Sequence, residues 1–432
     1  MEDMVIRHES IGTVIWSNKY KCYFITNDKE NEKEINEIFK NGKKEGKIYN
    51  ELVKMGLNGK IKEIFSDNKD GIMAPLEYYF DFTNVCNLKC SHCYNRKNMN
   101  TVTMSSEQIE KIIKDMYKNG IMRIHLAGGE PTLFPKQLET YLSTAKKYGI
   151  MSSMATNGTA ITDEICEIIS RNDIFSITIS IESADEEKNA KIRGKGSLEK
   201  AKEGVKKLIE YREKNNQNYL VSIKVSYDTE TKREDFEKLI QLALNLKIDV
   251  LKFANPERCV FHEKGYYDET KEKYYENMKI IKELKNKYKG KLFITQISSP
   301  LNNCSNIGLP NMKGCIGAQE LIAINSKGNI NPCLMNSYNL GNIKDYKSIT
   351  EVYKSDRIKE YYKKIKNYEC GDCDYHNQCR GGCQVRKIVQ YGDIKKTDPL
   401  CPKKNENIIE SVQNAQNTEF KKFNKVAVLH SL

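Results

Sequence analysis

The alternation of strand and helix patterns between residues 76 and 297 limits the fold of this chain more than any other feature. Seven segments have strand character: "LEYYFDFT", "MRIHLAG", "MSSMATN", "FSITISI", "LVSIKVSY", "VLKFAN" and "LFITQI". Amphipathic stretches such as "SSEQIEKIIKDMYKNG", which begins with Ser-Ser and ends at a Gly, separate them. Strands that alternate with helices run parallel, so residues 73–297 are predicted to form an α/β unit, either a doubly wound sheet or a whole or partial barrel.

Length and composition exclude several classes of protein. A chain of 432 residues predicts two or three packed units. No apolar run reaches the length of a membrane span, and the start "MEDMVIRHES" lacks a signal-peptide pattern, so we expect a cytoplasmic protein with no membrane partner. The net charge of +12 comes from lysines spread over the whole chain without a basic, aromatic-rich stretch, which argues against a nucleic-acid partner.

Different patterns flank the α/β unit. Residues 1–72 include "GTVIWSNKYKCYFIT", which has strand composition with a turn at Ser17 and Asn18, and then a stretch with helical spacing; we expect a small sheet followed by two or three short helices. Residues 298–403 are rich in cysteine and lack long periodic elements, so bound metal is the candidate for holding them. Residues 404–432 are predicted to form a polar helix and a loose tail.

Fourteen cysteines in a cytoplasmic chain indicate metal ligation rather than disulfides, because that compartment keeps thiols reduced. Three of them, Cys86, Cys90 and Cys93, lie close together in "CNLKCSHC". Four thiolates close a structural zinc site or an iron-sulfur cluster, whereas three leave one iron of a four-iron cluster open to another ligand. A zinc knuckle that lacks one ligand is the alternative.

The spacing of these cysteines, with His92 in the aromatic position, resembles the Cys-x3-Cys-x-aromatic-Cys segment of the radical S-adenosylmethionine (SAM) enzymes. The resemblance implies a partial (β/α)6 barrel and a 4Fe-4S cluster whose open iron binds SAM. It also implies an electron donor such as flavodoxin or ferredoxin, because one electron cleaves SAM to a 5′-deoxyadenosyl radical. The cofactors carry this chemistry, and the protein positions and shields them.

The segment "LAGGEPTL" at the end of the second strand resembles the part of the family that contacts the SAM ammonium group. Its residues are Gly128, Gly129, Glu130 and Pro131. Glycines allow backbone carbonyls to approach a ligand closely, and a carboxylate pairs with a cation. An ordinary turn from strand to helix is the alternative.

Further SAM contacts are implied near the ends of the following strands, in "TNGT", "SIES" and "RGKG". The candidates are Asn157, Ser180, Glu182 and Arg193. By resemblance, Ser180 and Arg193 hold the SAM carboxylate, a task that suits the bidentate fork of an arginine. Glu182 is expected to contact the ribose or the substrate. A solvated loop arginine is the alternative for Arg193.

A second cysteine array follows, and its spacings resemble those of the SPASM domain, which implies two auxiliary 4Fe-4S clusters. By position, one cluster is held by Cys370, Cys373, Cys379 and Cys401, and three ligands of the other are Cys315, Cys333 and Cys383. Cys304 is the candidate for the missing ligand, although related enzymes place that ligand at a shorter spacing. An iron left open to a substrate thiolate is the alternative, and a pair of zinc ribbons is the alternative for the whole array.

A SPASM domain implies an enzyme that acts on peptides or proteins, either a sulfatase maturase or a maturase of ribosomally made, post-translationally modified peptides (RiPPs). Sulfatase maturases have an aspartate after the cysteine that corresponds to Cys333, but Leu334 stands here. They also lack a long extension before the SAM cysteines. The extension resembles a RiPP recognition element, a winged-helix-like module that binds a leader peptide as an added strand. A plain capping domain is the alternative.

These features together predict a radical SAM maturase that abstracts a hydrogen atom from a precursor peptide, bound through its leader, and installs a crosslink. The first choice is a Cys thioether of the sactipeptide or ranthipeptide kind. Carbon-carbon crosslinking, epimerisation and sulfatase-type oxidation are the alternatives among enzymes, and an iron-sulfur or zinc protein without turnover is the alternative outside them. No spacing in the sequence singles out a general base.

Overall fold

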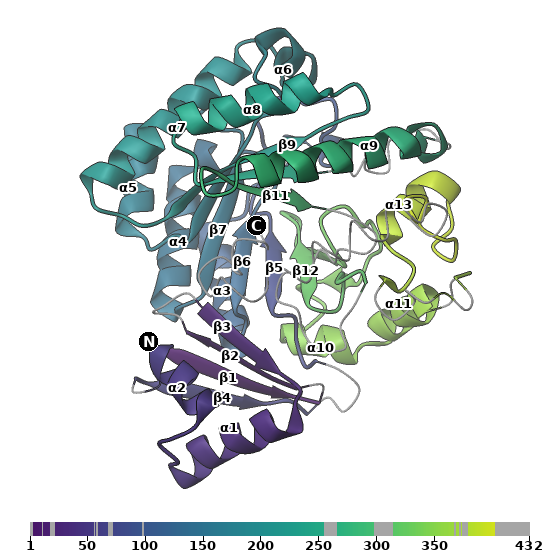
Figure 1. Cartoon of the computed structure of the whole chain (residues 1–432). Coiled ribbons are helices and arrows are strands. Elements are labelled where there is room, and N and C mark those ends of the chain that lie inside the picture. Colours follow the sequence, from purple (N-terminus) through teal and green to yellow (C-terminus); the bar gives the residue numbers. More distant parts are fainter. Residues whose placement is uncertain are drawn as a thin grey trace.

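Two β-sheets organise the chain in the computed structural model, which describes residues 3–10, 12–17, 22–55, 57, 59–67, 72–96, 99–254, 266–297, 314–366, 369–370, 373 and 379–401. A four-stranded sheet has the strand order β3-β2-β1-β4, and a ten-stranded sheet has the order β11-β10-β9-β8-β7-β6-β5-β12-β13-β14. In Figure 1 the smaller sheet, in purple, lies at one end of the molecule below the larger one.

The smaller sheet is formed by the N-terminal residues. Its elements are β1 (Met4–Glu9), β2 (Gly12–Ser17), β3 (Cys22–Thr26), α1 (Lys29–Asn41), α2 (Lys47–Lys54) and β4 (Ile61–Phe65). The first three strands are antiparallel neighbours, and β4 returns to pair parallel with β1. The sheet and helices agree with the expected order of elements, whereas the parallel return of β4 was not predicted. The strand β3 forms one edge of this sheet.

The larger sheet contains every strand expected between residues 76 and 297. The strands are β5 (Glu77–Phe80), β6 (Arg123–Leu126), β7 (Met151–Thr156), β8 (Ser176–Ser180), β9 (Leu220–Ser226), β10 (Val250–Ala254) and β11 (Phe293–Ile297). The helices are α3 (Ser106–Lys118), η2 (Pro131–Leu133), α4 (Pro135–Tyr148), α5 (Asp163–Arg171), α6 (Glu186–Arg193), α7 (Ser197–Lys214), α8 (Arg233–Asn245) and α9 (Tyr266–Lys287). Neighbouring strands from β5 to β11 pair parallel, and the sheet does not close, which confirms a partial barrel.

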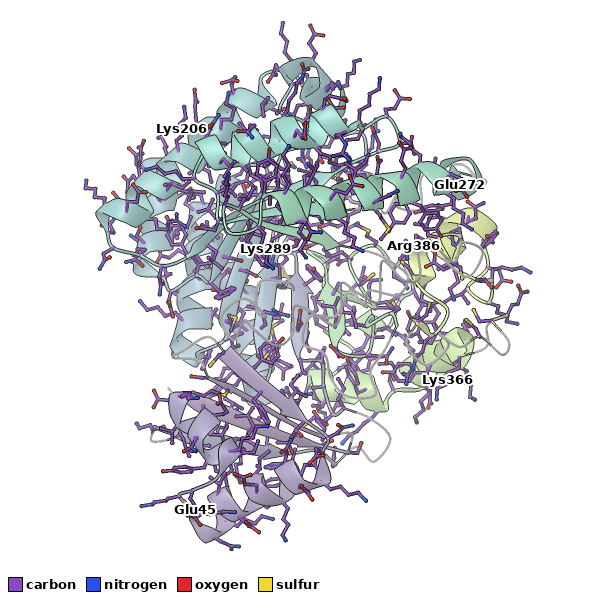
Figure 2. The ribbon with its side chains drawn as sticks, in the orientation of Figure 1. Glu45, Lys206, Glu272, Lys289, Lys366 and Arg386 are labelled. Atoms are coloured by element: carbon purple, nitrogen blue, oxygen red, sulfur yellow. The ribbon has the colours of Figure 1, made fainter. Side chains whose placement is uncertain are left out.

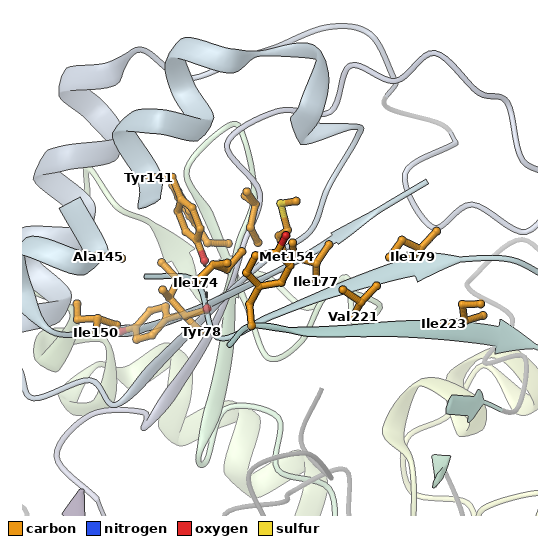
Figure 3. Close-up of a cluster of buried hydrophobic side chains, with 14 of the residues drawn as sticks. Tyr78, Tyr141, Ala145, Ile150, Met154, Ile174, Ile177, Ile179, Val221 and Ile223 are labelled. Carbon is orange, nitrogen blue, oxygen red and sulfur yellow. Dashed lines mark hydrogen bonds between the residues drawn. The ribbon is translucent and has the colours of Figure 1, made fainter. Parts of the chain in front are cut away.

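The two faces of this sheet differ in polarity because side chains alternate along each strand. On β8, Ile177 and Ile179 are fully buried in the core that also contains Tyr141 of α4, as Figure 3 shows. The residues that alternate with them, Ser176, Thr178 and Ser180, point to the opposite face. The apolar face therefore packs under the helices and leaves a polar face for chemistry.

The cysteine-rich region continues the larger sheet instead of forming a separate layer. Its elements are β12 (Leu321–Ile324), β13 (Asn329–Asn331), β14 (Gly341–Asn342), α10 (Ile349–Lys354), α11 (Asp356–Lys366) and α13 (Gln384–Tyr391). Strand β12 pairs parallel with β5, in register from Leu321 opposite Glu77 to Ile324 opposite Phe80. Strand β5 leads directly into the segment of Cys86, so this segment starts between the barrel and the cysteine-rich region.

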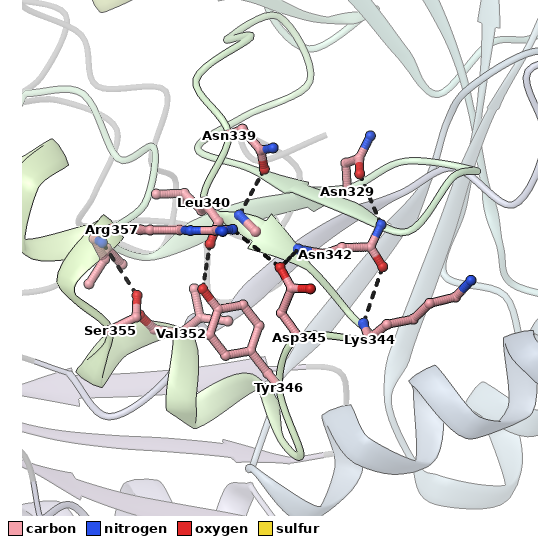
Figure 4. A network of polar contacts seen from close by, with 12 residues as sticks. Asn329, Asn339, Leu340, Asn342, Lys344, Asp345, Tyr346, Val352, Ser355 and Arg357 are labelled. Atoms are coloured by element: carbon pink, nitrogen blue, oxygen red, sulfur yellow. Dashed lines mark hydrogen bonds and ion pairs between the residues drawn. The ribbon is translucent and has the colours of Figure 1, made fainter.

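Polar contacts organise the turn between β14 and α10. The Asn342 amide nitrogen donates to Asn329 Oδ1 at 2.9 Å, and the Asn342 backbone N–H donates to Asp345 Oδ2 at 2.9 Å. Arg357 at the start of α11 also reaches Asp345 Oδ2, at 3.2 Å, and these contacts form one network in Figure 4. Side-chain hydrogen bonds therefore link the hairpin to the helices in this part of the chain.

A buried arginine joins the N-terminal sheet to the barrel. Arg7 on β1 has no exposed surface, and its guanidinium donates to the carbonyls of Ala74, Pro75 and Gly120 at 2.5 to 3.1 Å. It also forms an ion pair with Glu9. Ala74 and Pro75 lie just before β5, so β1 and β5 are fixed relative to one another. Among the described residues, no helix has the length and apolar character needed to cross a membrane.

Candidate functional site

The three cysteines of the first array lie in the segment after β5 and are free thiols. Cys90 is 9% exposed, and the side chains of Cys86 and Cys93 are partly buried. Burial raises the pKa of Cys86 to about 11, and the nearby Glu130, Cys90 and Cys93 add to this increase. The three sulfur atoms are therefore close enough to influence one another electrostatically.

Nitrogen donors from three different segments approach two of these sulfur atoms. The backbone N–H of Leu88 donates to Cys86 Sγ at 3.4 Å, and Asn157 Nδ2 donates to the same atom at 3.8 Å. Arg193 Nη1 donates to Cys90 Sγ at 3.8 Å. Hydrogen bonds to a sulfur favour its thiolate form, which is the form that binds metal. Burial still raises the pKa of both thiols, so these hydrogen bonds offset only part of its effect.

Among the residues that the structure describes, no group of three or more His, Cys, Asp or Glu side chains is arranged to hold one metal ion. Cysteine thiolates bind both zinc and iron-sulfur clusters, so the residue types of this segment fit either group.

The glycine segment after β6 packs against both ends of the cysteine segment. The backbone N–H of Gly129 donates to Thr83 O at 2.9 Å, and that of Gly128 donates to Tyr94 Oη at 2.8 Å. Gly128 has a φ of 102°, and a Cβ added to Gly129 would lie 2.0 Å from Val85 O. Side chains are excluded here because two backbones meet, and this contact positions the cysteines.

Alanine at Gly129 is therefore expected to displace the cysteine segment, because its Cβ would overlap the carbonyl of Val85. We expect Gly129→Ala to lose iron at this site and to lose SAM binding, measured by iron content and by SAM titration under anoxic conditions. Gly290→Ala is the matched control: Gly290 also has a positive φ, 82°, but a Cβ there meets no atom within 4 Å. Normal iron content and SAM affinity in Gly129→Ala would contradict this account.

Glu130 connects the segments after β6 and β7. Its fully buried carboxylate accepts from Thr132 Oγ1 and Thr156 Oγ1 at 2.7 Å each through Oε1, and from the backbone N–H of Asn157 at 2.7 Å through Oε2. Burial raises the pKa of this carboxyl group despite these bonds. The sequence did not indicate this connecting role. A contact of Glu130 with the SAM ammonium group stays a prediction.

A buried ion pair lies beside Cys90. Glu182, just after β8, is 7% exposed and accepts from Arg193 Nε at 3.0 Å through Oε1. His92 Nε2 lies 3.4 Å from the same oxygen, and Ser226 N–H donates to Oε2 at 2.5 Å. Burial alone would raise the pKa of Glu182, but the charges of Arg193 and His92 outweigh it and lower the pKa. Glu182 is therefore a buried carboxylate that pairs with Arg193 and lies next to His92, beside the cysteines.

The remaining predicted residues lie at the same edge of the sheet. Pro131 begins η2 directly after Glu130. Ser180 ends β8 opposite Lys224 of β9, and its hydroxyl makes no hydrogen bond within the described residues. In the structure, the Arg193 guanidinium donates hydrogen bonds to Glu182 and Cys90. The sequence did not indicate this pairing. The expected SAM carboxylate contacts of Ser180 and Arg193 stay predictions.

Sequence reasoning missed Asp81 and Tyr94. The Tyr94 hydroxyl donates to Asp81 Oδ2 at 3.2 Å and accepts from Gly128 N–H, so it connects the end of β5, the cysteine segment and the glycine segment. Burial raises the pKa of Asp81 to about 7. The available signal was the position of Tyr94 directly after Cys93.

The second array falls into two groups of thiols. Burial, followed by the charges of Asp398, Cys401 and Cys370, raises the pKa of Cys379 to about 12. The buried Tyr361 has its pKa raised first by burial and then by a different set, Cys315, Cys333 and Cys383. The assignment of these cysteines to two clusters stays a prediction, and Cys373 lies near Cys370 in the sequence. Cys304 lies outside the described residues.

Comparisons with known proteins agree with both arrays. Residues 80–243 match the radical SAM superfamily, and residues 315–383 match SPASM, an iron-sulfur cluster-binding domain. The mycofactocin maturase MftC of Mycobacterium tuberculosis is 24% identical over 343 residues, 77% of this chain and 84% of MftC. An AdoMet-dependent heme synthase of Oleidesulfovibrio alaskensis is 24% identical over 356 residues, 77% of this chain and 88% of that protein.

The fold is similar to that of Streptococcus suis SuiB in its complex with the precursor peptide SuiA. The TM-score is 0.70 at 19% sequence identity, and the match covers 92% of this chain and 99% of SuiB. The unmatched 8% of 432 residues is about 35 residues, fewer than the N-terminal unit contains. The likeness in fold therefore extends into residues 1–72.

Proposed function

We propose that this protein is a maturase of a ribosomal precursor peptide. The chain belongs to the radical SAM superfamily and carries an iron-sulfur cluster-binding SPASM domain. It abstracts a hydrogen atom from that peptide and installs a crosslink, with a Cys thioether as the first choice. The observation that carries this proposal is the N-terminal sheet, which has an edge at β3 and is fixed to the barrel by Arg7.

The residues around the first array fit a cluster and SAM. Cys86, Cys90 and Cys93 would hold three irons of a 4Fe-4S cluster, and the fourth iron would be open to SAM. When bound, these cofactors supply a 5′-deoxyadenosyl radical. Asn157 and Arg193 orient the sulfur atoms, since each donates to one of them.

The side chains at the strand ends would orient SAM and keep its site in shape. The residues proposed for contacts with SAM are His92, Gly128, Gly129, Glu130, Pro131, Asn157, Ser180, Glu182 and Arg193. Glu130 and the Glu182–Arg193 pair also hold the segments after β6, β7 and β8 together, so they fix the position of the site. Burial of these groups excludes water, which protects a reactive radical.

The cysteine-rich region would hold two auxiliary 4Fe-4S clusters. Their proposed ligands are Cys370, Cys373, Cys379 and Cys401 for one cluster, and Cys315, Cys333, Cys383 and Cys304 for the other. Crosslink formation removes two hydrogen atoms from the peptide: one leaves with the deoxyadenosyl group, and the other leaves as a proton and an electron. When bound, an auxiliary cluster would serve as the acceptor of this electron or as a ligand site for the Cys thiolate, and a flavodoxin or ferredoxin would be the donor of the electron for SAM cleavage.

The N-terminal sheet would bind the leader of the precursor peptide. Strand β3 pairs only with β2 among the described strands, so its outer edge offers backbone groups to an added strand. SuiB, whose fold resembles that of this chain, has been seen with its precursor peptide bound. We propose that the chain consists of four units, residues 1–72, 73–297, 298–403 and 404–432.

A core peptide without its leader is expected to be a much poorer substrate. The leader holds the core segment near the barrel at high effective concentration, so its removal should lower kcat/KM by about 10²-fold or more. The measurement is product formation by mass spectrometry over a range of peptide concentrations, with the full precursor as control. Adding the leader as a separate peptide should inhibit modification of the full precursor. Equal kcat/KM for both substrates would contradict leader binding.

Two anoxic assays test the proposed function. With dithionite, SAM and the precursor peptide, the enzyme should form 5′-deoxyadenosine, whereas an iron-sulfur or zinc protein without turnover would form none. The peptide product then separates the reactions. A thioether lowers the mass by two hydrogen atoms and removes a Cys from alkylation, while a carbon-carbon crosslink lowers the mass equally and leaves the Cys reactive. Epimerisation leaves the mass unchanged in water, and sulfatase-type oxidation of a Cys removes its sulfur.

A further inference from the structure

A second buried ion pair lies in the cysteine-rich region. Arg386 on α13 and Asp398 have side chains that are 2% and 1% exposed. Arg386 Nη2 donates to Asp398 Oδ2 at 2.7 Å, and Arg386 Nε donates to Asp398 Oδ1 at 3.0 Å. Figure 2 shows Arg386 within the molecule, in contrast to Lys366 and Glu272 near its rim. Such a pair is expensive to bury, so its position needs an explanation.

The Asp398 carboxylate also binds the backbone of both cysteine segments around it. Cys383 N–H donates to Oδ2 at 2.6 Å, and Leu400 N–H donates to Oδ1 at 2.9 Å. The carbonyl of Asp398 accepts from Cys401 N–H at 2.9 Å. Cys383 is the residue that precedes α13, and Arg386 lies one turn further along that helix. Asp398 therefore accepts hydrogen bonds from Cys383, Arg386, Leu400 and Cys401, and it connects the segments of the two cysteines.

We propose that the Arg386–Asp398 pair is a positioning device that couples the two auxiliary clusters. This inference rests on the proposed function, in which Cys401 is a ligand of one cluster and Cys383 is a ligand of the other. The Asp398 side chain fixes both ligand segments, so neither cluster keeps its geometry when that side chain is truncated to a methyl group, whereas asparagine keeps an acceptor oxygen and removes only the charge. The pair also places one positive and one negative charge beside ligands of both clusters.

The charges predict opposite effects on the reduction potential of the clusters. Reduction adds an electron, so a nearby positive charge raises the potential and a negative charge lowers it. Asp398→Asn removes the negative charge and leaves Arg386, so the potential should rise. Arg386→Gln removes the positive charge and leaves Asp398, so the potential should fall. Arg386→Lys keeps the charge and should restore a potential near that of the unchanged protein.

The experiment uses the full-length holoenzyme after anoxic reconstitution. Iron content should be about twelve atoms per chain for three 4Fe-4S clusters and should fall to about four in Asp398→Ala, because both auxiliary clusters are lost. Potentials are measured by electron paramagnetic resonance during redox titration, in chains in which Cys86, Cys90 and Cys93 are replaced by alanine. Only the auxiliary signals remain in that background.

Asp249→Asn is the matched control, because Asp249 likewise accepts from an arginine, Arg212, and from a backbone N–H, that of Val221, at 2.5 and 2.7 Å. It should change neither iron content nor potentials. Loss of one cluster alone in Asp398→Ala, or potential shifts of the same sign in Asp398→Asn and Arg386→Gln, would overturn the coupling. An unchanged protein with only about four iron atoms per chain would refute the proposed auxiliary clusters as well, so the two failures are distinguishable.

Discussion

Alanine at Cys90 is expected to abolish formation of 5′-deoxyadenosine while the auxiliary clusters stay in place. Cys90 is one of three thiols in the segment after β5. Three thiolates bind only three of the four irons, and the two that remain without Cys90 are too few to hold the cluster. The second array lies in other segments, which Arg386 and Asp398 stabilise independently. Iron content should therefore fall by about four of about twelve atoms per chain. Anoxic SAM cleavage with dithionite and an iron assay provide the measurement.

Cys166→Ala is the control for this prediction. Cys166 is a fully buried free thiol in α5 and lies outside both arrays. Its replacement should leave iron content and SAM cleavage as they are in the unchanged protein. Product formation by Cys90→Ala at the normal rate would show that the first array does not bind the cluster on which SAM is cleaved.

Glutamine at Glu182 is expected to cost about 3–5 kcal/mol of unfolding free energy, because it leaves the buried Arg193 without its counter-charge. The Arg193 and Glu182 side chains are only 10% and 1% exposed, so water cannot replace the lost partner. SAM affinity should fall as well, since the segments of Cys90, Glu182 and Arg193 lose their common contact. Urea unfolding of the protein without iron and SAM titration of the holoenzyme measure the two effects.

Glu139→Gln is the matched control, because Glu139 pairs with Arg171 on the surface, where the side chains are 32% and 56% exposed. Solvent screens this pair, so its loss should cost less than about 1 kcal/mol. An equal, small loss of stability in both variants would mean that the Glu182–Arg193 pair contributes no more than a surface contact, and it would contradict the role given to Glu182 beside Cys90.

The strands and helices of the central unit can be predicted from local sequence patterns. The pairing of strands that lie far apart in the sequence cannot. Every expected strand from β5 to β11 forms, since each has an apolar face that packs under a helix. Helix α3 begins where Ser105 caps it, as the Ser-Ser start indicated. By contrast, β12 joins β5 from more than 240 residues away, and β4 returns to β1 across two helices. Pairing of distant strands depends on the edges that remain open, which no local period encodes.

In the candidate site, too, some features can be predicted from the sequence and others cannot. The cysteines and the glycine segment have spacings that are typical of the chemistry of those residue types, so the sequence alone indicates them. The ion pairs beside them cannot be predicted in this way. The sequence predicts Glu182 and Arg193 as separate contacts, and no motif in it indicates Arg386 or Asp398. Only packing reveals that these charges are buried and paired.

The central claim is that a radical generated from SAM takes a hydrogen atom from a peptide. The most direct test is the mass of the 5′-deoxyadenosine formed under anoxic conditions, with dithionite and a precursor peptide whose non-exchangeable positions carry deuterium. The account predicts 5′-deoxyadenosine that has gained one deuterium, in amounts that match the modified peptide. Unlabelled 5′-deoxyadenosine alongside a modified peptide would contradict it.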